Sequence, residues 1–258
     1  VQEWSRVAKR AVNEGCLIHL GRIFGIMVEK NSELEEARRK YKYRVVFQGN
    51  NVVTQDYEAA QFQDAGSSPA SMEAGKCVTA HGLMPGNKIE QADAEQAYVQ
   101  ADLEGPETWV LIPPEAWPAS WYNKDGTPKY NRPVCRLLKA LYGHPDAGTM
   151  WERHAHKRLV KQGFRPVVNW PSVYRHEKLD LLLSVYVDDF LLSGRQENLA
   201  RGWELIRKVL NVETPTDMGL YLGCEHEFGE MQVEGVGKVR TVVWNQESYL
   251  KKICDDYK

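Results

Sequence analysis

Hydrophobic residues along the chain follow two spacings, which predict two kinds of element. Spacings of three and four, as in Trp4, Val7 and Ala11, are typical of amphipathic helices. Short apolar runs rich in β-branched and aromatic residues are typical of strands. We expect helices over 4–12, 72–81 (capped by Ser71 and stopped at Gly82), 149–162 and 199–210, a strand pair over 17–28, and strands over 38–47, 108–112, 173–175 and 239–244.

One hydrophobic run is interrupted by two adjacent carboxylates. Residues 181–187 lead into Asp188 and Asp189, and the apolar run resumes at Phe190. This pattern predicts a β-hairpin with both aspartates at its turn. Its flanks are too hydrophobic to lie exposed, so the carboxylates would sit at the rim of a buried sheet and repel each other unless a cation lies between them. Mg²⁺ is the natural partner, and a solvated turn is the alternative interpretation.

A basic strand is predicted at residues 38–47. Alternation places Lys40, Lys42 and Arg44 on one face and Tyr41, Tyr43 and Val45 on the other. This arrangement suits a strip of cations that grips phosphates above a packed apolar side. A solvated strand face is the competing interpretation.

Residues 104–133 are rich in proline and tryptophan. This composition excludes long helices and predicts an extended loop around the short strand at 108–112. The tryptophans and prolines can line a nucleic-acid groove by stacking, or they can pack the loop onto its own domain.

The whole-chain composition is that of an ordinary globular protein. Among 258 residues, 33 are basic and 35 acidic, so any nucleic-acid surface must be a local patch. The five cysteines lack zinc-site spacing, which favours reduced thiols and an intracellular protein. No apolar run reaches membrane-spanning length, and a chain that opens at Val1 without a signal-peptide pattern is expected to be a segment of a longer protein.

Several motifs, taken in order, resemble the reverse transcriptases of Ty1/copia-type retrotransposons. Residues 185–194 resemble the YVDD segment, and 88–99 resemble the QMDVKxAF box, with Asp93 as its carboxylate and Tyr98 at its aromatic position. Further similar stretches are 38–47 (KxRLV), 134–143 (VCKLxKSLYG), 219–225 (a hairpin near the primer end) and 245–250 (ISQxxY). The chain departs from the family at 144–149, where its Lys and Arg are missing, and at Glu95, which replaces a Lys.

The resemblance implies an α+β, right-hand polymerase fold with an antiparallel palm sheet and a fingers subdomain. It implies one reverse transcriptase domain over 1–258. Fingers would take mainly 17–87 and part of 104–148, palm mainly 88–103 and 149–228, and the start of the connecting region 229–258.

The resemblance also implies site residues. Asp93, Asp188 and Asp189 would be catalytic and would bind two Mg²⁺ ions, with Mn²⁺ as a substitute; Asp188 would be the more direct ligand and Asp189 partly supporting. Lys42, Arg44, Tyr98, Tyr142 and Gly143 would bind the nucleotide, with Tyr98 excluding ribose, and Leu222 and Gly223 would contact the primer.

Implied partners are an RNA or DNA template with its primer and deoxynucleoside triphosphates, without a membrane; the oligomeric state is left open. The implied location is intracellular, in cytoplasmic virus-like particles, with the nucleus as a second compartment. Two alternatives stay open. One is an inactive transposon-derived relic that folds and binds nucleic acid, and the other is an unrelated metal-dependent phosphotransferase built on a similar palm.

Overall fold

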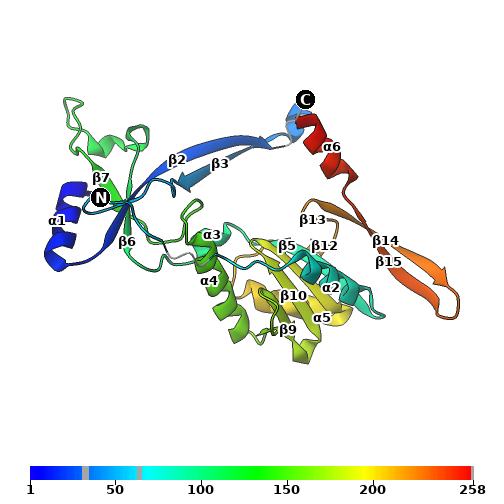
Figure 1. Ribbon diagram of the computed structural model, residues 1–258. Helices are drawn as coiled ribbons and strands as arrows, with labels where there is room; N and C mark the ends of the chain where they lie inside the picture. Colours follow the sequence, from blue (N-terminus) through cyan, green and yellow to red (C-terminus); the bar gives the residue numbers. More distant parts are fainter. Residues whose placement is uncertain (31–34, 63–65, 257–258) are drawn as a thin grey trace. The chain divides into compact units, whose positions relative to one another are not determined.

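A computed structural model describes residues 1–30, 35–62 and 66–256. The chain divides into two compact units, and each is described by itself. The first unit comprises Val1–Gly66 and Tyr98–Trp151, and the second comprises Ser67–Ala97 and Glu152–Lys258. Both contain helices and sheets, which confirms the expected α+β class (Figure 1). The assignment of fingers and palm stays a prediction.

The first unit is built on a six-stranded sheet. Its strands run in the order β1 (Gln2–Glu3), β7 (Pro133–Arg136), β6 (Glu107–Leu111), β2 (Ile18–Lys30) and β3 (Lys40–Phe47), and β4 (Val53–Thr54) also pairs with β2. Helix α1 (Trp4–Glu14) confirms the first helix prediction. It buries Trp4, Val7 and Ala11 in a cluster with residues of β2 and β6.

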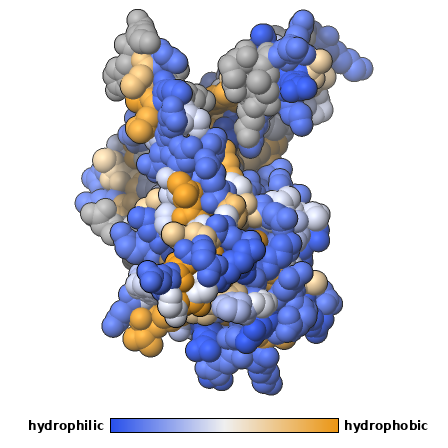
Figure 2. All heavy atoms as spheres, turned by 90° about the vertical axis from the view of Figure 1, so that its right-hand side faces the viewer, coloured by the Kyte–Doolittle hydropathy of each residue, from blue (hydrophilic) through white to orange (hydrophobic). Residues whose placement is uncertain are grey.

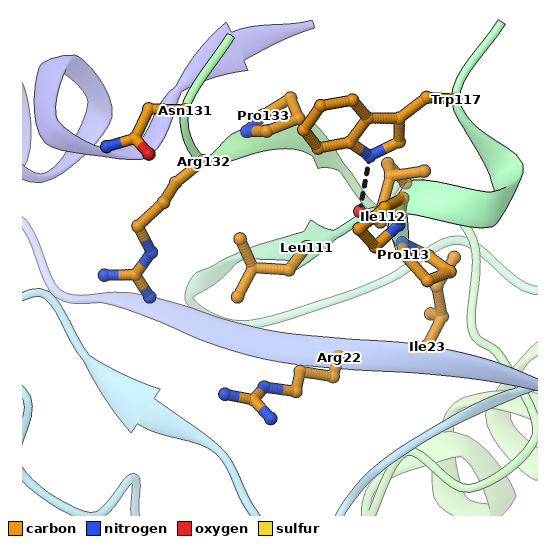
Figure 3. Close-up of a pocket in the computed structure, with 10 residues that line it drawn as sticks. Arg22, Ile23, Leu111, Ile112, Pro113, Trp117, Asn131, Arg132 and Pro133 are labelled. Atoms are coloured by element: carbon orange, nitrogen blue, oxygen red, sulfur yellow. Dashed lines mark hydrogen bonds between the residues drawn. The ribbon is translucent and has the colours of Figure 1, made fainter. Parts of the chain in front are cut away.

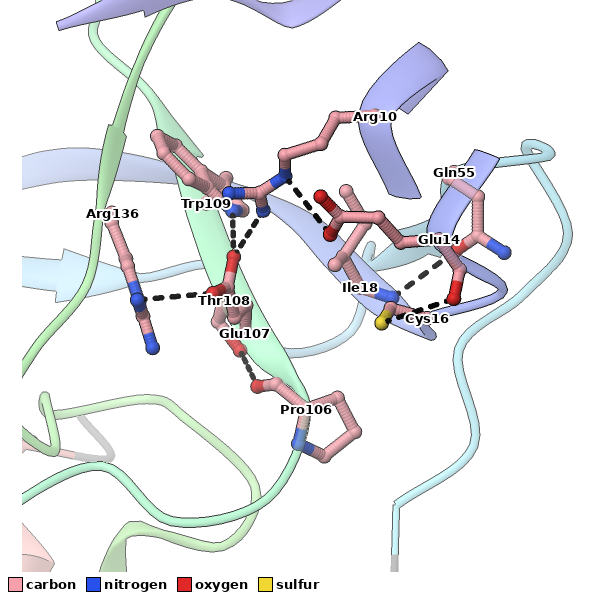
Figure 4. Close-up of polar contacts among 10 residues, drawn as sticks. All are labelled: Arg10, Glu14, Cys16, Ile18, Gln55, Pro106, Glu107, Thr108, Trp109 and Arg136. Atoms are coloured by element: carbon pink, nitrogen blue, oxygen red, sulfur yellow. Dashed lines mark hydrogen bonds and ion pairs between the residues drawn. The ribbon is translucent and has the colours of Figure 1, made fainter. Parts of the chain in front are cut away.

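A polar network joins α1 to β6 (Figure 4). The Glu107 carboxylate accepts hydrogen bonds from Arg10 Nη2 at 2.5 Å and Trp109 Nε1 at 3.2 Å, and it pairs with Arg136 at 3.0 Å. Partial burial opposes ionisation of Glu107, but these donors outweigh it and lower the pKa of the carboxyl. The network therefore fixes the helix against the sheet with its charges paired.

The predicted strand pair over 17–28 is wrong. These residues form one long strand, β2, whose first part pairs with β6 and β4 and whose second part, from Ile23 onward, pairs with β3. Two glycines in this stretch make room for aromatic rings of β3. A Cβ at Gly21 would collide with the Phe47 ring, and one at Gly25 would collide with Tyr43.

The β2–β3 hairpin also corrects the prediction of a packed apolar side. Lys40, Lys42 and Arg44 do share one face of β3, as expected. However, Tyr41 and Tyr43 on the opposite face are exposed, at 73% and 62%. On the face shown in Figure 2, hydrophobic residues lie in separate patches between hydrophilic ones.

The second unit is built on a six-stranded antiparallel sheet. The order is β12 (Thr216–Asp217), β5 (Asn87–Asp93), β11 (Asp189–Arg195), β10 (Leu181–Tyr186), β9 (Val173–His176) and β8 (Arg165–Pro166). Helices α2 (Met72–Leu83) and α5 (Gln196–Arg207) pack on this sheet. Val78 of α2 meets Ile89 and Leu191, whereas α5 approaches Leu181 and Leu192. Because side chains alternate along a strand, the two helices cover opposite faces.

Helix α2 follows its prediction at the start and departs from it at the end. Ser71 caps it by accepting a hydrogen bond from the Ala74 N–H at 3.2 Å. Gly82 does not stop the helix but lies inside it. A glycine is needed there because a Cβ would approach Ile89 Cβ to 2.7 Å. In this helix Val78 is buried, whereas Cys77 and Met72 are exposed.

The remaining elements complete the two units. Helix α4 (Ala147–Lys161) confirms the helix predicted over 149–162, and it buries Trp151, Ala155 and Leu159. A third sheet joins three strands in the order β13, β14 and β15. No helix among the described residues is long and apolar enough to cross a membrane. Bounds not yet given are η1 (Glu36–Arg38), α3 (Ala97–Gln100), η2 (Pro114–Ala116), η3 (Ala119–Trp121), η4 (Glu177–Leu179), β13 (Leu220–Tyr221), β14 (Cys224–Val233), β15 (Gly237–Asn245) and α6 (Glu247–Asp256).

Candidate active site

The two adjacent aspartates lie at a tight hairpin turn in the second unit. The β10–β11 register pairs Tyr186 with Asp189, so Val187 and Asp188 form a two-residue turn. Val187 has φ of 56°, a strained conformation for a β-branched residue. The Ala94 N–H donates to the Asp188 carbonyl at 2.7 Å and ties the turn to the end of β5. The predicted hairpin is confirmed, with Asp189 as the first residue of β11.

Asp93 is brought to this turn although it is distant in sequence. It is the last residue of β5 and lies directly opposite Asp189 in the β5–β11 register. Directly opposed residues have Cβ atoms about 4.5–5.5 Å apart and point to the same face. The two carboxyl groups therefore face each other, on the side of the sheet that α2 covers.

The electrostatics of Asp189 reflect this crowding. Burial, the negative charges of Asp188 and Asp93, and a hydrogen bond with Asp93 raise the pKa of the Asp189 carboxyl to about 7. Two carboxylates held this close stabilise a proton or a cation between them. The metal-binding role that the sequence predicted for these aspartates stays a prediction.

The donor set is consistent with a magnesium site completed by substrate. Among the described residues, no group of three or more His, Cys, Asp or Glu is arranged to hold a metal ion. Mg²⁺, however, usually takes one or two carboxylates and fills its other positions with water and substrate phosphates. The facing Asp93 and Asp189 meet that requirement. The ranking of Asp188 as the more direct ligand stays a prediction.

The hairpin predicted to contact the primer lies on the same face of the sheet. Strands β13 and β14 are joined by Leu222 and Gly223, with φ of 50° and 75°, and Tyr221 is buried against Ile89 and Leu191. Both residues have positive φ, as the two-residue turns that favour glycine require.

Gln91 is a residue whose role the sequence reasoning missed. Its side chain donates to the Leu220 carbonyl at 3.1 Å and accepts from the Gly219 N–H at 3.3 Å. It lies on β5 two residues before Asp93, so it ties the hairpin to the carboxylate strand. Its only sequence signal was its place in the box around Asp93, because its partners are far along the chain.

In the first unit the structure brings together Tyr98 and Tyr142, both predicted to bind the nucleotide. Their ring centroids are 4.6 Å apart, and Tyr98 also packs against Ala101 and Ala140. Gly143 has φ of 87°, and a Cβ there would collide with the Phe47 carbonyl. The Phe47 N–H donates to the Tyr142 carbonyl at 2.7 Å, so the turn is held against the end of β3.

The turn after Gly143, which lacks the Lys and Arg that the resemblance implies for this stretch, carries a buried histidine. His144 packs against Phe47 and Phe62 at centroid distances of 5.1 and 5.3 Å. Its Nε2 atom is buried and has no hydrogen-bond partner among the described residues. Burial, with a contribution from His19, lowers the pKa of His144 to about 4. This histidine is therefore neutral near pH 7 and does not replace the missing charges.

Lys42 and Arg44 lie together on the exposed β2–β3 hairpin. The register places Val28 opposite Lys42 and Ile26 opposite Arg44, so this face alternates cations with apolar side chains. Arg44 is exposed, and its side chain forms no hydrogen bond or ion pair within the part of the chain that the structure describes. Its guanidinium is available for an anion.

Comparison with known proteins agrees with these features. The sequence model of the family described as "Reverse transcriptase (RNA-dependent DNA polymerase)" matches residues 24–257. The chain belongs to this reverse transcriptase family. The resemblance to Ty1/copia-type polymerases is thereby confirmed, since the similar curated proteins are Pol polyproteins of such transposons.

These relatives of the reverse transcriptase chain are much longer proteins. The retrovirus-related Pol polyprotein from transposon RE2 of Arabidopsis thaliana is 29% identical over 140 residues, which are 53% of this chain and 9% of the polyprotein. The truncated transposon Ty1-A Gag-Pol polyprotein of Saccharomyces cerevisiae is 29% identical over 111 residues, 43% of this chain and 8% of that protein. The matched stretch spans less than a tenth of each.

Proposed function

We propose that the chain is an RNA-directed DNA polymerase that adds deoxynucleotides to a primer 3′-hydroxyl by two-metal catalysis. The observation that carries the proposal is the pairing of Asp93 with Asp189 beside Asp188 and its turn. Membership of the reverse transcriptase family supports the reaction class. In this proposal the second unit is the palm and β2–β3 belongs to the fingers.

The carboxylates have a defined task in this reaction. Asp93 and Asp189, with Asp188 beside them, would hold the two Mg²⁺ ions, and Mn²⁺ would substitute. When bound, such ions lower the pKa of the primer hydroxyl and steady the leaving pyrophosphate. The raised pKa of Asp189 means that the pair binds a cation in competition with a proton.

The other residues would position the substrates. Leu222 and Gly223 would contact the primer from a hairpin that Gln91 holds on the carboxylate face. Lys42 and Arg44 would neutralise the triphosphate.

Tyr98, Tyr142 and Gly143 would form the nucleotide site, in which the Tyr98 ring excludes a 2′-hydroxyl. The ring contact between Tyr98 and Tyr142 supports this role, because it fixes the Tyr98 ring in place. Tyr98→Val tests the exclusion, since ribonucleotide incorporation should rise relative to deoxynucleotide incorporation.

The function is tested by primer extension on an RNA template with Mg²⁺. Asp188→Asn should abolish extension and leave the fold intact, because the change keeps the size of the side chain and removes one charge. Asp125→Asn is the matched control. This exposed aspartate accepts hydrogen bonds at Oδ1 from Thr127, which asparagine preserves. Full extension by Asp188→Asn would contradict the metal assignment.

A second candidate is an inactive relic that binds nucleic acid. The observation that favours it is the turn at 144–149, which has neither Lys nor Arg and whose histidine is buried and neutral. It predicts salt-dependent primer–template binding by the purified protein with no extension in Mg²⁺ or Mn²⁺. Extension by the unmodified chain would exclude it.

A further inference from the structure

The first unit contains a cavity that none of its predicted nucleotide-binding residues lines. Its volume is about 460 Å³, within the range of roughly 300–1,000 Å³ usual for small-ligand sites. It lies where the proline- and tryptophan-rich segment meets β2 (Figure 3). The lining residues that matter for the argument are Arg22, Pro113, Trp117, Asn131, Arg132 and Pro133.

Two arginines give this cavity its charge. Arg22 is exposed, and its side chain has no hydrogen bond or ion pair among the described residues. Arg132 Nη1 donates to the Tyr57 hydroxyl at 2.9 Å, a neutral acceptor that leaves its charge uncompensated. Among the described residues, no acid lines the cavity. The Glu3 carboxylate approaches the lining segment only at its backbone, where it accepts from the N–H groups of Asn131 and Arg132.

The opposite side of the cavity is flat and rigid. In Figure 3 Arg132 lies on the left of the cavity, Arg22 lies at the bottom beside β2, and Trp117 stands at the top right. The Trp117 Nε1–H donates to the Ile112 carbonyl at 2.8 Å, which fixes the ring orientation. Trp121 and Tyr122 support it at centroid distances of 5.9 and 6.1 Å. A fixed aromatic face that costs no ordering on binding is suited to stacking.

We propose that this cavity binds one nucleotide unit of single-stranded nucleic acid. The base stacks on Trp117, and Arg22 and Arg132 contact its phosphates. Arginine pairs well with phosphate through its forked donors, and every base presents a stacking face. The choice of a nucleic acid as the source rests on the proposed polymerase function. The evidence for the site itself is the two arginines without an acidic partner and the fixed Trp117 ring across the cavity.

The test is fluorescence anisotropy with a labelled single-stranded oligonucleotide and the full chain. Trp117→Ala should weaken binding about tenfold, within the range for removing one stacked base, and Trp117→Phe should retain most of the affinity. A plot of log affinity against log salt concentration has a negative slope. The double variant Arg22→Gln/Arg132→Gln should make this slope shallower by about 0.7 for each phosphate that the two arginines neutralise. Arg6→Gln is the matched control, since Arg6 is exposed on α1 of the same unit and its side chain forms no hydrogen bond or ion pair with the rest of the described chain.

Competition and crosslinking separate this site from a general anion site. Uridine monophosphate should displace the oligonucleotide at concentrations at which inorganic phosphate does not, and a 5-iodouracil strand should crosslink within residues 109–133. Equal displacement by phosphate, crosslinks elsewhere, or an unchanged affinity and salt slope in the variants would overturn the proposal. Thermal unfolding of each variant shows that weaker binding does not come from unfolding.

The two proposals can fail separately. A chain that extends primers but binds single strands without dependence on Arg22, Arg132 and Trp117 would contradict the cavity alone. A chain that binds strands through these residues but never extends a primer would contradict the polymerase alone.

Discussion

The hairpins β10–β11 and β2–β3 have similar compositions and opposite environments. Both are rich in aliphatic and aromatic residues. In β10–β11, Leu183 and Leu191 are 0% exposed, whereas Met27 and Tyr43 of β2–β3 are 66% and 62% exposed. The first hairpin is the centre of its sheet. The second projects from its sheet, because from Ile23 onward β2 pairs only with β3 among the described strands.

The difference comes from the neighbours of each hairpin. Helices α2 and α5 cover the two faces of β10–β11, and β5 and β9 pair with its edges. Beyond Arg22, β2 has only β3 beside it among the described strands. A hydrophobic pattern therefore predicts a strand, but burial is decided by elements that arrive from elsewhere in the chain. The rigid hairpin carries the aspartates, and the exposed one carries the cations predicted to meet a mobile substrate.

The largest expected effect contrasts one buried and one exposed side chain. Leu191→Ala should lower the free energy of unfolding by about 2–5 kcal/mol, because it leaves a cavity in a fully packed site. Met27→Ala should change it by less than about 0.5 kcal/mol. Chemical denaturation of both variants measures the difference. Equal destabilisation would mean that the β2–β3 hairpin is covered in solution.

The next effect tests the close packing of α2 on the sheet. Gly82→Ala should destabilise the protein by about 1–3 kcal/mol, although alanine favours helices, because its Cβ would approach Ile89 Cβ to 2.7 Å. Gly75→Ala on the same helix is the control. Its nearest neighbour would be Tyr221 at 3.6 Å, so it should stabilise by about 0.5–1 kcal/mol. A stabilising Gly82→Ala would show that α2 packs loosely on the sheet.

The third effect probes the base of the exposed hairpin through pH. The folded-state pKa of His144 is about 4, below the ordinary 6.5, so folding disfavours its protonation. Its contribution to stability is therefore present above pH 6.5 and lost as pH falls towards 4. Between pH 7 and pH 5 this contribution should fall by about 1–2 kcal/mol.

Two variants isolate this histidine. His144→Asn keeps an acceptor for the Asp146 N–H, which donates to His144 Nδ1 at 3.2 Å, and His144→Phe keeps a ring against Phe47. In both variants the midpoint of unfolding should fall less steeply than in the unmodified chain as the pH is lowered from 7 to 5. If both variants kept the pH dependence of the unmodified chain, a residue other than His144 would be the titrating group.

The smallest effect concerns the two hydrogen bonds by which Gln91 of β5 holds the segment at Gly219 and Leu220, next to the β13–β14 hairpin. Gln91→Leu removes two hydrogen bonds, and it should cost about 1 kcal/mol and weaken primer–template binding roughly fivefold. Gln232→Leu on the exposed part of β14 is the control and should leave binding unchanged. Equal affinities for the two variants would remove the hairpin from the primer site.

Local pattern predicted much of the secondary structure and the carboxylate hairpin. The cap at Ser71, the periodicity of α4 and α5, and the interruption of an apolar run at Asp188 are all properties of neighbouring residues. The features that local pattern did not predict depend on partners far along the chain. The single long β2 follows from aromatic rings of β3 over Gly21 and Gly25, Gln91 finds its partners near residue 220, and His144 is buried by Phe47 and Phe62. Neighbouring residues in the sequence do not predict these contacts.

The central claim is that Asp93 and Asp189 hold the catalytic metal. Fe²⁺ substituted for Mg²⁺ generates hydroxyl radicals on addition of peroxide and cuts the backbone beside its own site. We expect cleavage near residues 93 and 188–189, suppressed by excess Mg²⁺ and abolished in Asp189→Asn but not in Asp125→Asn. Cleavage at other positions, or cleavage that survives Asp189→Asn, would contradict the account.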